Sequence, residues 1–138
     1  MKRLTLLWLV LVMVSCHKTD YDLEQINGYW EIVEAQTPYG TKQYKMSKSV
    51  DYFYLESDST GLRKKVQPSL LGKHKITESN ENFTFITKND SLKIKFSSPY
   101  DAWTEHVLEL TENKLVLKNN QSIIYTYKRF KPIEVEQQ

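Results

Sequence analysis

The sequence predicts an all-β protein, an antiparallel up-and-down β-barrel of about eight to nine strands. Short runs rich in Val, Ile, Tyr, Phe and Thr recur along the chain, and clusters of Asn, Asp, Ser, Gly and Pro separate them. The runs follow one another at about 8–12 residues, a rhythm that is typical of barrels and sandwiches. Because short polar turns join consecutive runs, a meander is the simplest topology, and its closure removes the exposed sheet edges.

The clearest strand pair spans residues 82–97. In residues 92–97 every second residue is apolar, so one face of this strand is predicted to be buried. Residues 82–87 show a similar pattern, and the polar residues 88–91 between the two runs predict a hairpin turn.

The other elements follow from the same signals of composition and turn residues. Residues 22–26 could form a short helical turn directly before the first strand, and evidence for any other helix is thin. The further strands that we expect are residues 28–35, 51–56, 62–66, 72–77, 106–110, 114–117 and 123–128.

The N-terminus carries the features of a secretion signal. Lys2 and Arg3 precede an apolar stretch at residues 4–14, which is shorter than the roughly 20 apolar residues that a membrane span needs. The stretch ends in Met-Val-Ser-Cys, which resembles the lipobox read by lipoprotein signal peptidase. This resemblance implies that Cys16 takes lipid and becomes the mature N-terminus. An ordinary secretory peptide or a buried apolar strand is the alternative.

The chain thereby divides into four parts. Residues 1–15 are predicted to be the lipoprotein signal peptide, and residues 16–24 the lipidated cysteine with its polar tether. Residues 25–131 are expected to form one barrel domain, followed by a flexible C-terminal tail at residues 132–138. Since Cys16 is the only cysteine, no disulfide can form, and the domain must rest on packing and strand pairing.

The charge balance argues against a nucleic-acid partner. The chain has a formal net charge of +2, and Lys2 and Arg3 supply this excess. The mature chain is therefore balanced, whereas phosphate backbones are bound by clustered Lys and Arg.

The start and end of the predicted barrel resemble a known family. Gly28, Tyr29 and Trp30 match the G-x-W signature of the lipocalin superfamily. Together with the lipobox, the short tether and the aromatic and basic residues 127–130, they make the chain resemble lipocalin-like lipoproteins of gut-dwelling Gram-negative bacteria. The resemblance implies a lipocalin-like barrel in which Arg129 packs over Trp30. Such a pair is structural, contributes about 0.5–2 kcal/mol and closes one end of the barrel.

No pattern of catalytic, metal-binding or cofactor-binding residues stands out. His17, His74 and His106 are far apart in the sequence, and no second cysteine accompanies them. The serines lack a G-x-S-x-G context, and the 4 glycines leave no Gly-rich phosphate loop. We therefore expect no catalytic residue, no metal and no cofactor.

The aromatic content allows a ligand-binding interior. Core packing accounts for most of the 9 Tyr and 5 Phe, but a barrel of this width can also hold one small apolar molecule. Lys64 alternates with Leu62 and Val66, so it could point inward as a counter-ion for an acidic ligand; a solvated basic patch is the alternative. The candidate ligand-lining residues are Tyr52, Tyr54, Lys64, Phe83, Phe85, Ile94, Phe96, Leu108 and Tyr125.

These features predict a membrane-anchored lipocalin-like lipoprotein that binds a small apolar or amphipathic ligand. The alternative is a protein-interaction module with a solid core that docks an envelope partner in an inhibitory or immunity role, and a hydrolase is the third option. Tyr100 and Trp103 in a predicted loop could form a binding rim or fold over the barrel mouth. Asp does not directly follow Cys16, which argues against retention in the inner membrane by the rule known for some Gram-negative lipoproteins. We therefore expect the outer membrane of a Gram-negative bacterium, with the domain facing either the periplasm or the outside of the cell.

Overall fold

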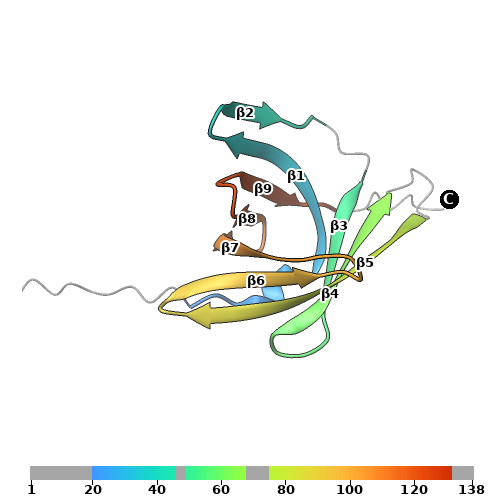
Figure 1. The fold of residues 1–138 in the computed structure, drawn as a ribbon. Coiled ribbons are helices and arrows are strands. Elements are labelled where there is room, and N and C mark those ends of the chain that lie inside the picture. The colour runs from blue at the N-terminus through green and yellow to red at the C-terminus, as the bar shows by residue number, and fades with distance from the viewer. Residues whose placement is uncertain (1–19, 46–48, 68–74, 132–138) are drawn as a thin grey trace, which may run out of the picture.

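A computed structural model describes residues 20–45, 49–67 and 75–131, with the backbone alone at 75–79. The strands form one antiparallel sheet in the order β2-β1-β3-β4-β5-β6-β7-β8-β9, and β1 also pairs with β9 (Figure 1). Because β1 pairs with both β3 and β9, the eight strands other than β2 close a barrel, and β2 is an extra strand that pairs with β1 alone. The predicted all-β barrel is therefore confirmed. The strands are β1 (Gly28–Thr37), β2 (Gly40–Gln43), β3 (Val50–Leu55), β4 (Thr60–Gln67), β5 (Lys75–Lys88), β6 (Ser91–Ser97), β7 (Ala102–Leu110), β8 (Lys114–Lys118) and β9 (Ile124–Arg129).

Three strands differ from the sequence prediction. β5 is continuous where two strands were expected, because a bulge accommodates the polar residues that resemble a turn. Lys64 of β4 pairs with Asn80 and Val66 pairs with Ile76, so β5 has more residues than β4 between these two pairs. β7 begins four residues before the expected position 106, because Ala102 already pairs with Ser97 of β6. β2 was not predicted at all, since none of its four residues is buried.

A single turn of 3-10 helix, η1 (Leu23–Ile26), precedes β1 and matches the expected helical turn. The side chain of Asp22 caps it by accepting the Glu24 N–H at 3.2 Å. Ile26 is fully buried, and its carbonyl oxygen accepts the indole N–H of Trp30 at 2.8 Å. Among the described residues, no helix is long and apolar enough to span a membrane.

The core fills the part of the barrel next to η1. Phe53, Phe83 and Phe96 are 1% exposed or less, and the Phe53 and Phe83 rings meet edge to face with centroids 5.6 Å apart. Gly61 of β4 lies opposite Phe83, and a Cβ on it would be 2.1 Å from the Tyr54 carbonyl oxygen and 2.7 Å from the Phe83 ring. The neighbouring backbone and the phenylalanine ring therefore leave no room for a side chain at this position. The buried cluster consists of Ile26, Trp30, Phe53, Phe83, Phe85, Leu92, Ile94, Phe96, Val107, Leu110, Leu115 and Leu117.

Arg129 covers the core at the end of the barrel next to η1. Its guanidinium carbon lies 3.9 Å from the centroid of the Trp30 ring, which is the stacking that the family resemblance implied. The same guanidinium donates hydrogen bonds to the carbonyl oxygens of Gln25 (2.6 Å), Asn27 (2.6 Å) and Glu112 (2.8 Å). One side chain therefore ties together the segment before β1, the turn after β7 and the end of β9.

Candidate functional site

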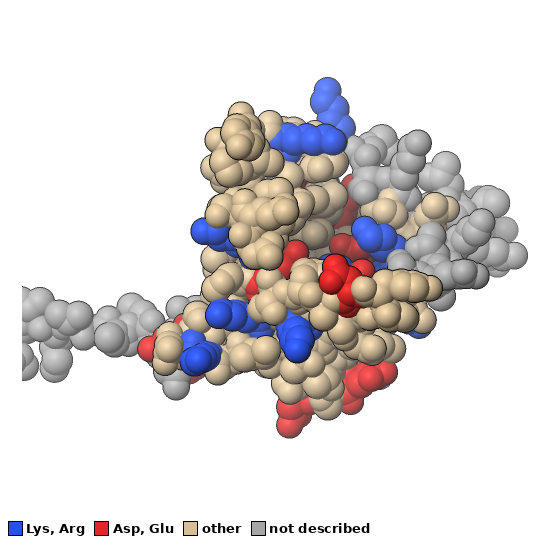
Figure 2. All heavy atoms as spheres, viewed as in Figure 1, with Lys and Arg blue, Asp and Glu red and all other residues tan. Residues whose placement is uncertain are grey.

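Beyond the aromatic core, the barrel interior is polar. Asp51 of β3, Arg63 of β4 and Glu105 of β7 are each only 8% exposed, and Glu81 of β5 lies opposite Arg63 in the β4–β5 register. We refer to Asp51, Arg63, Glu81 and Glu105 as the interior polar cluster. In the space-filling view, acidic atoms lie set back between the β6–β7 turn and the upper strands (Figure 2).

Arg63 is the centre of this cluster. Its guanidinium forms an ion pair with the carboxylate of Glu81. Its guanidinium carbon also lies 4.0 Å from the centroid of the Phe96 ring and 5.7 Å from that of Trp103. The Phe96 and Trp103 rings stack on each other with centroids 5.5 Å apart. Arg63 is thus held on aromatic faces with its charge already neutralised.

The two remaining carboxylates are not equally compensated. Asp51 lies 3.8 Å from the ammonium of Lys65, whose side chain is half exposed. The carboxylate of Glu105 accepts no hydrogen bond from any residue that the structure describes. Burial raises the pKa of Glu105, the charge of Arg63 lowers it, and the nearby Asp51 and Glu81 raise it further. Among the described residues, Glu105 is therefore the cluster member whose carboxylate has neither a hydrogen bond nor an ion pair.

Tyr127 of β9 completes the polar interior. Burial is the main cause that raises the pKa of its phenol, and the charges of Asp51 and Glu105 raise it further while Arg63 lowers it. The hydroxyl therefore stays protonated at every physiological pH and can donate a hydrogen bond. Side chains from five strands thus act on one another across the barrel, which no local sequence pattern reveals.

Comparison with known proteins identifies the fold family. The family model described as the lipocalin-like domain matches residues 26–117, which is most of the barrel. The chain belongs to the lipocalin-like domain family. Comparison with curated protein sequences gives no significant match. The lipocalin-like barrel is typical of small-ligand binding and is generally a binding fold rather than a catalytic one.

Several solved structures are similar to this lipocalin-like domain. A lipocalin-like protein from Bacteroides uniformis has a TM-score of 0.48 at 12% identity, covering 77% of this chain and 99% of that one. An uncharacterized protein from Bacteroides eggerthii has a TM-score of 0.47 at 19% identity, covering 75% and 98%. Lobster apocrustacyanin A1 has a TM-score of 0.46 at 13% identity, covering 82% of this chain and 66% of that one.

The structure separates the predicted ligand-lining residues into two groups. Phe83, Phe85, Ile94 and Phe96 are buried in the core of the lipocalin-like barrel, and Tyr125 on β9 is half-buried opposite Leu117. Whether any of them contacts a ligand stays a prediction.

The other predicted residues lie on the outer face, so their inward placement was wrong. Phe53 is buried, and because side chains alternate along a strand, Tyr52 and Tyr54 point the other way. Tyr52 packs on Tyr29 with ring centroids 4.8 Å apart, and Tyr54 is 52% exposed. Leu108 is 47% exposed beside the buried Val107.

The inward placement of Lys64 was also wrong. β4 pairs Arg63 with the buried Phe53 and Lys64 with the outward Tyr52, so Arg63 is the inward cation. The flanking Leu62 and Val66 had indicated the opposite phase, because residues on both faces of this strand are apolar. The signal that sequence reasoning missed is the register, which sets Arg63 opposite Glu81.

The remaining predicted positions have separate outcomes. Trp103 belongs to β7 and is half-buried against Phe96, whereas Tyr100 is 96% exposed at the β6–β7 turn. His106 is exposed, while Cys16, His17 and His74 lie outside the described residues. Among the residues that the structure describes, no group of three or more His, Cys, Asp or Glu side chains could hold a metal ion.

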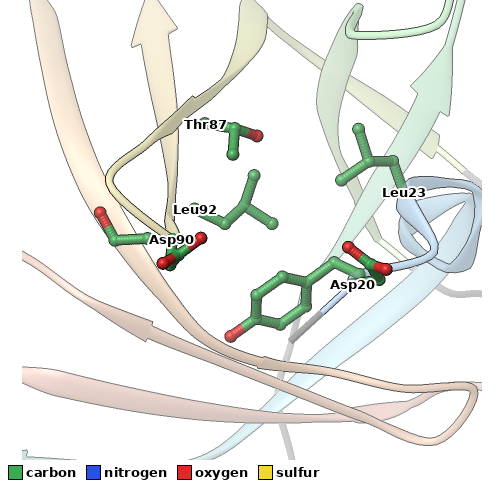
Figure 3. A pocket seen from close by; sticks show the side chains of 7 residues that line it. Asp20, Leu23, Thr87, Asp90 and Leu92 are labelled. Atoms are coloured by element: carbon green, nitrogen blue, oxygen red, sulfur yellow. The ribbon is translucent and has the colours of Figure 1, made fainter. Parts of the chain in front are cut away.

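A small pocket of about 130 Å³ lies outside the barrel interior, where the chain enters the domain. Asp20 and Leu23 approach it from the segment before β1, and Thr87, Asp90 and Leu92 from the β5–β6 hairpin (Figure 3). The N-terminal segment is held there because the Tyr21 hydroxyl donates to the Val107 carbonyl at 3.3 Å. This pocket lies at the end of the barrel where residues 20–23 enter the domain.

Replacing Glu105 with glutamine should remove a pH-dependent loss of stability. The folded pKa of Glu105 is raised above its ordinary value of 4.5, so its contribution to stability is fully present below about pH 4.5 and is lost as the pH rises through the folded pKa. Glu105→Gln should therefore become progressively more stable relative to the wild type over this interval. By pH 7 the difference should be about 1–3 kcal/mol.

Urea denaturation of both proteins between pH 4 and pH 8 measures this effect. Glu56→Gln is the matched control, because Glu56 is exposed at the start of the β3–β4 turn. Parallel stability curves for the wild type and Glu105→Gln would contradict the assignment of a desolvated carboxyl to Glu105.

Proposed function

We propose that this lipocalin-like domain is a membrane-anchored lipoprotein that binds a small ligand inside the barrel, at the interior polar cluster. The observation that carries the proposal is the unsatisfied buried carboxylate of Glu105 among the charges of Asp51, Arg63 and Glu81. Binding sites characteristically combine apolar walls with a few convergent polar groups.

Stability alone does not account for this cluster. Burying a charge costs free energy unless it is paired and hydrogen-bonded, and well-packed apolar residues often stabilise a core as well as a buried ion pair does. The core next to η1 is built in that apolar way, whereas Arg63 and three carboxylates occupy the other part of the same barrel. A function in recognition explains why the charges are retained there.

Native mass spectrometry of protein purified without detergent tests ligand binding. We expect a co-purifying mass in the range of a small organic molecule, which is lost on unfolding. A spectrum that holds only the bare chain, together with a solid barrel interior in a crystal structure, would argue against this function.

The proposed anchor is the lipidated Cys16, after removal of residues 1–15. Four peptide units separate Cys16 from Asp20, so these residues lie at most about 14 Å apart. The end of the barrel where Asp20 and the β5–β6 hairpin meet would then face the bilayer. The outer membrane of a Gram-negative bacterium is the proposed location, and protease treatment of whole cells distinguishes a periplasmic domain from a surface-exposed one.

Replacing Cys16 should abolish lipidation. Cells fed radiolabelled palmitate should label the wild-type protein, and its intact mass should correspond to a chain that begins at Cys16 with acyl groups attached. Cys16→Ser should carry no label and keep its signal segment. Ser15→Ala is the matched control, because a small residue still precedes the cysteine, and it should be labelled normally. An unlabelled wild-type protein would refute the anchor.

A protein-interaction module is the second candidate function. Tyr39 and Tyr100, on the β1–β2 and β6–β7 turns, are 99% and 96% exposed. Exposed aromatic side chains are common at the centres of protein interfaces. Pull-down with the wild type and with a Tyr39→Ser/Tyr100→Ser variant tests this candidate, and only a stoichiometric partner lost in the variant would support it.

A further inference from the structure

We infer that the ligand of this barrel carries a cationic amine, and that its ammonium group binds the carboxylate of Glu105. The inference rests on the proposed ligand-binding function and deepens it by naming the chemical class of the ligand. The inferred ligand is positively charged, whereas an inward-pointing Lys64 would have favoured an acidic ligand.

The charge balance of the interior favours a cation. Three carboxylates, those of Asp51, Glu81 and Glu105, act on this region, and Arg63 is the only buried cation among the described residues. Arg63 is already paired with Glu81, so an acidic ligand would have to compete with that carboxylate. It would also be repelled by the other two, since like charges at short range are unfavourable.

Glu105 is the group that a bound cation would satisfy. It is 8% exposed and its carboxylate accepts no hydrogen bond from any described residue. An ammonium group offers three donors in a compact charge, which is what an acceptor-only carboxylate lacks. The ligand would thus supply both the hydrogen bond and the counter-charge that Glu105 does not receive from the described residues.

The residues around Glu105 indicate the size and character of the part of the ligand beyond its ammonium group. Trp103, two residues earlier on the same face of β7, is half-buried and stacks on Phe96, so it contributes an aromatic surface. Tyr127 of β9 adds a buried phenol, whose pKa the charge of Glu105 helps to raise. Aromatic faces attract cations and stack on flat apolar groups. The core below is filled by side chains such as Trp30 and Leu117, which are 0% exposed, so a long acyl chain has no place there. The ligand is therefore a short arylalkyl amine.

Three probes that share a phenylethyl group and differ in their polar group test the inference. Isothermal titration calorimetry at pH 7 would compare 2-phenylethylamine, 2-phenylethanol and 3-phenylpropionate, with the mature chain from residue 16, which holds every strand of the closed barrel. We expect the amine to bind at least tenfold more tightly than either other probe, because only the amine brings a positive charge to the carboxylate of Glu105 together with its hydrogen bond.

Substitutions on β7 then assign the contact. Glu105→Gln should weaken the amine at least tenfold and leave 2-phenylethanol unchanged, and Glu105→Asp should weaken the amine less. Glu109→Gln is the matched control on the same strand, because its side chain is 42% exposed and pairs with Lys114, and it should bind the amine like the wild type.

Each other result has a distinct meaning. If 3-phenylpropionate binds best, or if Glu105→Gln binds the amine normally, the inference is wrong while ligand binding in the barrel stands. If none of the three probes binds the wild type, the inference is also overturned, and a bare chain in native mass spectrometry would then remove the proposed function with it. Near-ultraviolet circular dichroism of each variant shows that the aromatic core is intact.

Discussion

Replacing Arg129 with alanine is expected to lower the free energy of unfolding by about 2–4 kcal/mol. The substitution removes the cation stacked on Trp30 and leaves three carbonyl oxygens, those of Gln25, Asn27 and Glu112, without their donor. Because Arg129 ties the segment before β1 and the turn after β7 to the end of β9, this end of the barrel should open as well as lose contact energy. Urea denaturation followed by tryptophan fluorescence measures both effects.

Arg129→Lys separates shape from charge. A lysine keeps the positive charge but lacks the planar fork that donates to three carbonyl groups at once. We therefore expect it to recover less than half of the lost stability. Lys95→Ala is the control, because Lys95 is exposed on β6, and it should change stability by less than about 0.5 kcal/mol. Full recovery by Arg129→Lys would show that charge alone stabilises this end.

The Arg129 contact also explains the Gly-x-Trp pattern in physical terms. Gly28 has a φ of +117°, a conformation that side-chain-bearing residues rarely adopt, and a Cβ there would lie 2.9 Å from Nη1 of Arg129. Trp30 supplies the surface on which the same guanidinium rests. The glycine therefore makes room for the arginine and the tryptophan receives it, so the two residues of the pattern serve one contact.

The sequence predicted the fold because each strand carries its own evidence. Alternation in residues 92–97 and the polar turn at 88–91 specify a hairpin without knowledge of the rest of the chain. The prediction failed where the evidence was not local. The polar residues within β5 resemble a turn, and only the bulge against β4 shows that the strand continues through them.

The site was harder to predict because it depends on strand phase and register. Arg63 and Lys64 are adjacent, and their neighbours are apolar on both faces, so the choice between them depends on which residue pairs with Phe53. Glu105 was missed because the predicted strand began one residue after it. Trp30 and Arg129, in contrast, were found together, because a family pattern records a contact between residues that are distant in sequence.

Replacing Arg63 with methionine is expected to cost about 3–5 kcal/mol at pH 7. Methionine keeps an unbranched side chain beside the Phe96 and Trp103 rings but removes the guanidinium that faces them, so the loss combines the ion pair with the cation–π contact. Glu81 then loses its ion-pair partner while its side chain is only 16% exposed, and the attraction that stabilises ionised Glu105 is removed as well. The variant should unfold at a lower urea concentration with little change in m value.

Removing the second partner should reverse most of this loss. In Arg63→Met/Glu81→Leu no charge of the pair is left buried, and an apolar replacement of a buried ion pair is often neutral. We therefore expect the double variant to be at least 2 kcal/mol more stable than Arg63→Met, with the coupling obtained from the full double-mutant cycle. Lys64→Met, on the outer face, is the control and should be nearly neutral. The deficit of Arg63→Met should also shrink as the pH falls, because protonated carboxyls need no counter-ion. If the double variant is no more stable than Arg63→Met, then the aromatic contacts of Arg63, and not its charge, hold this part of the barrel together.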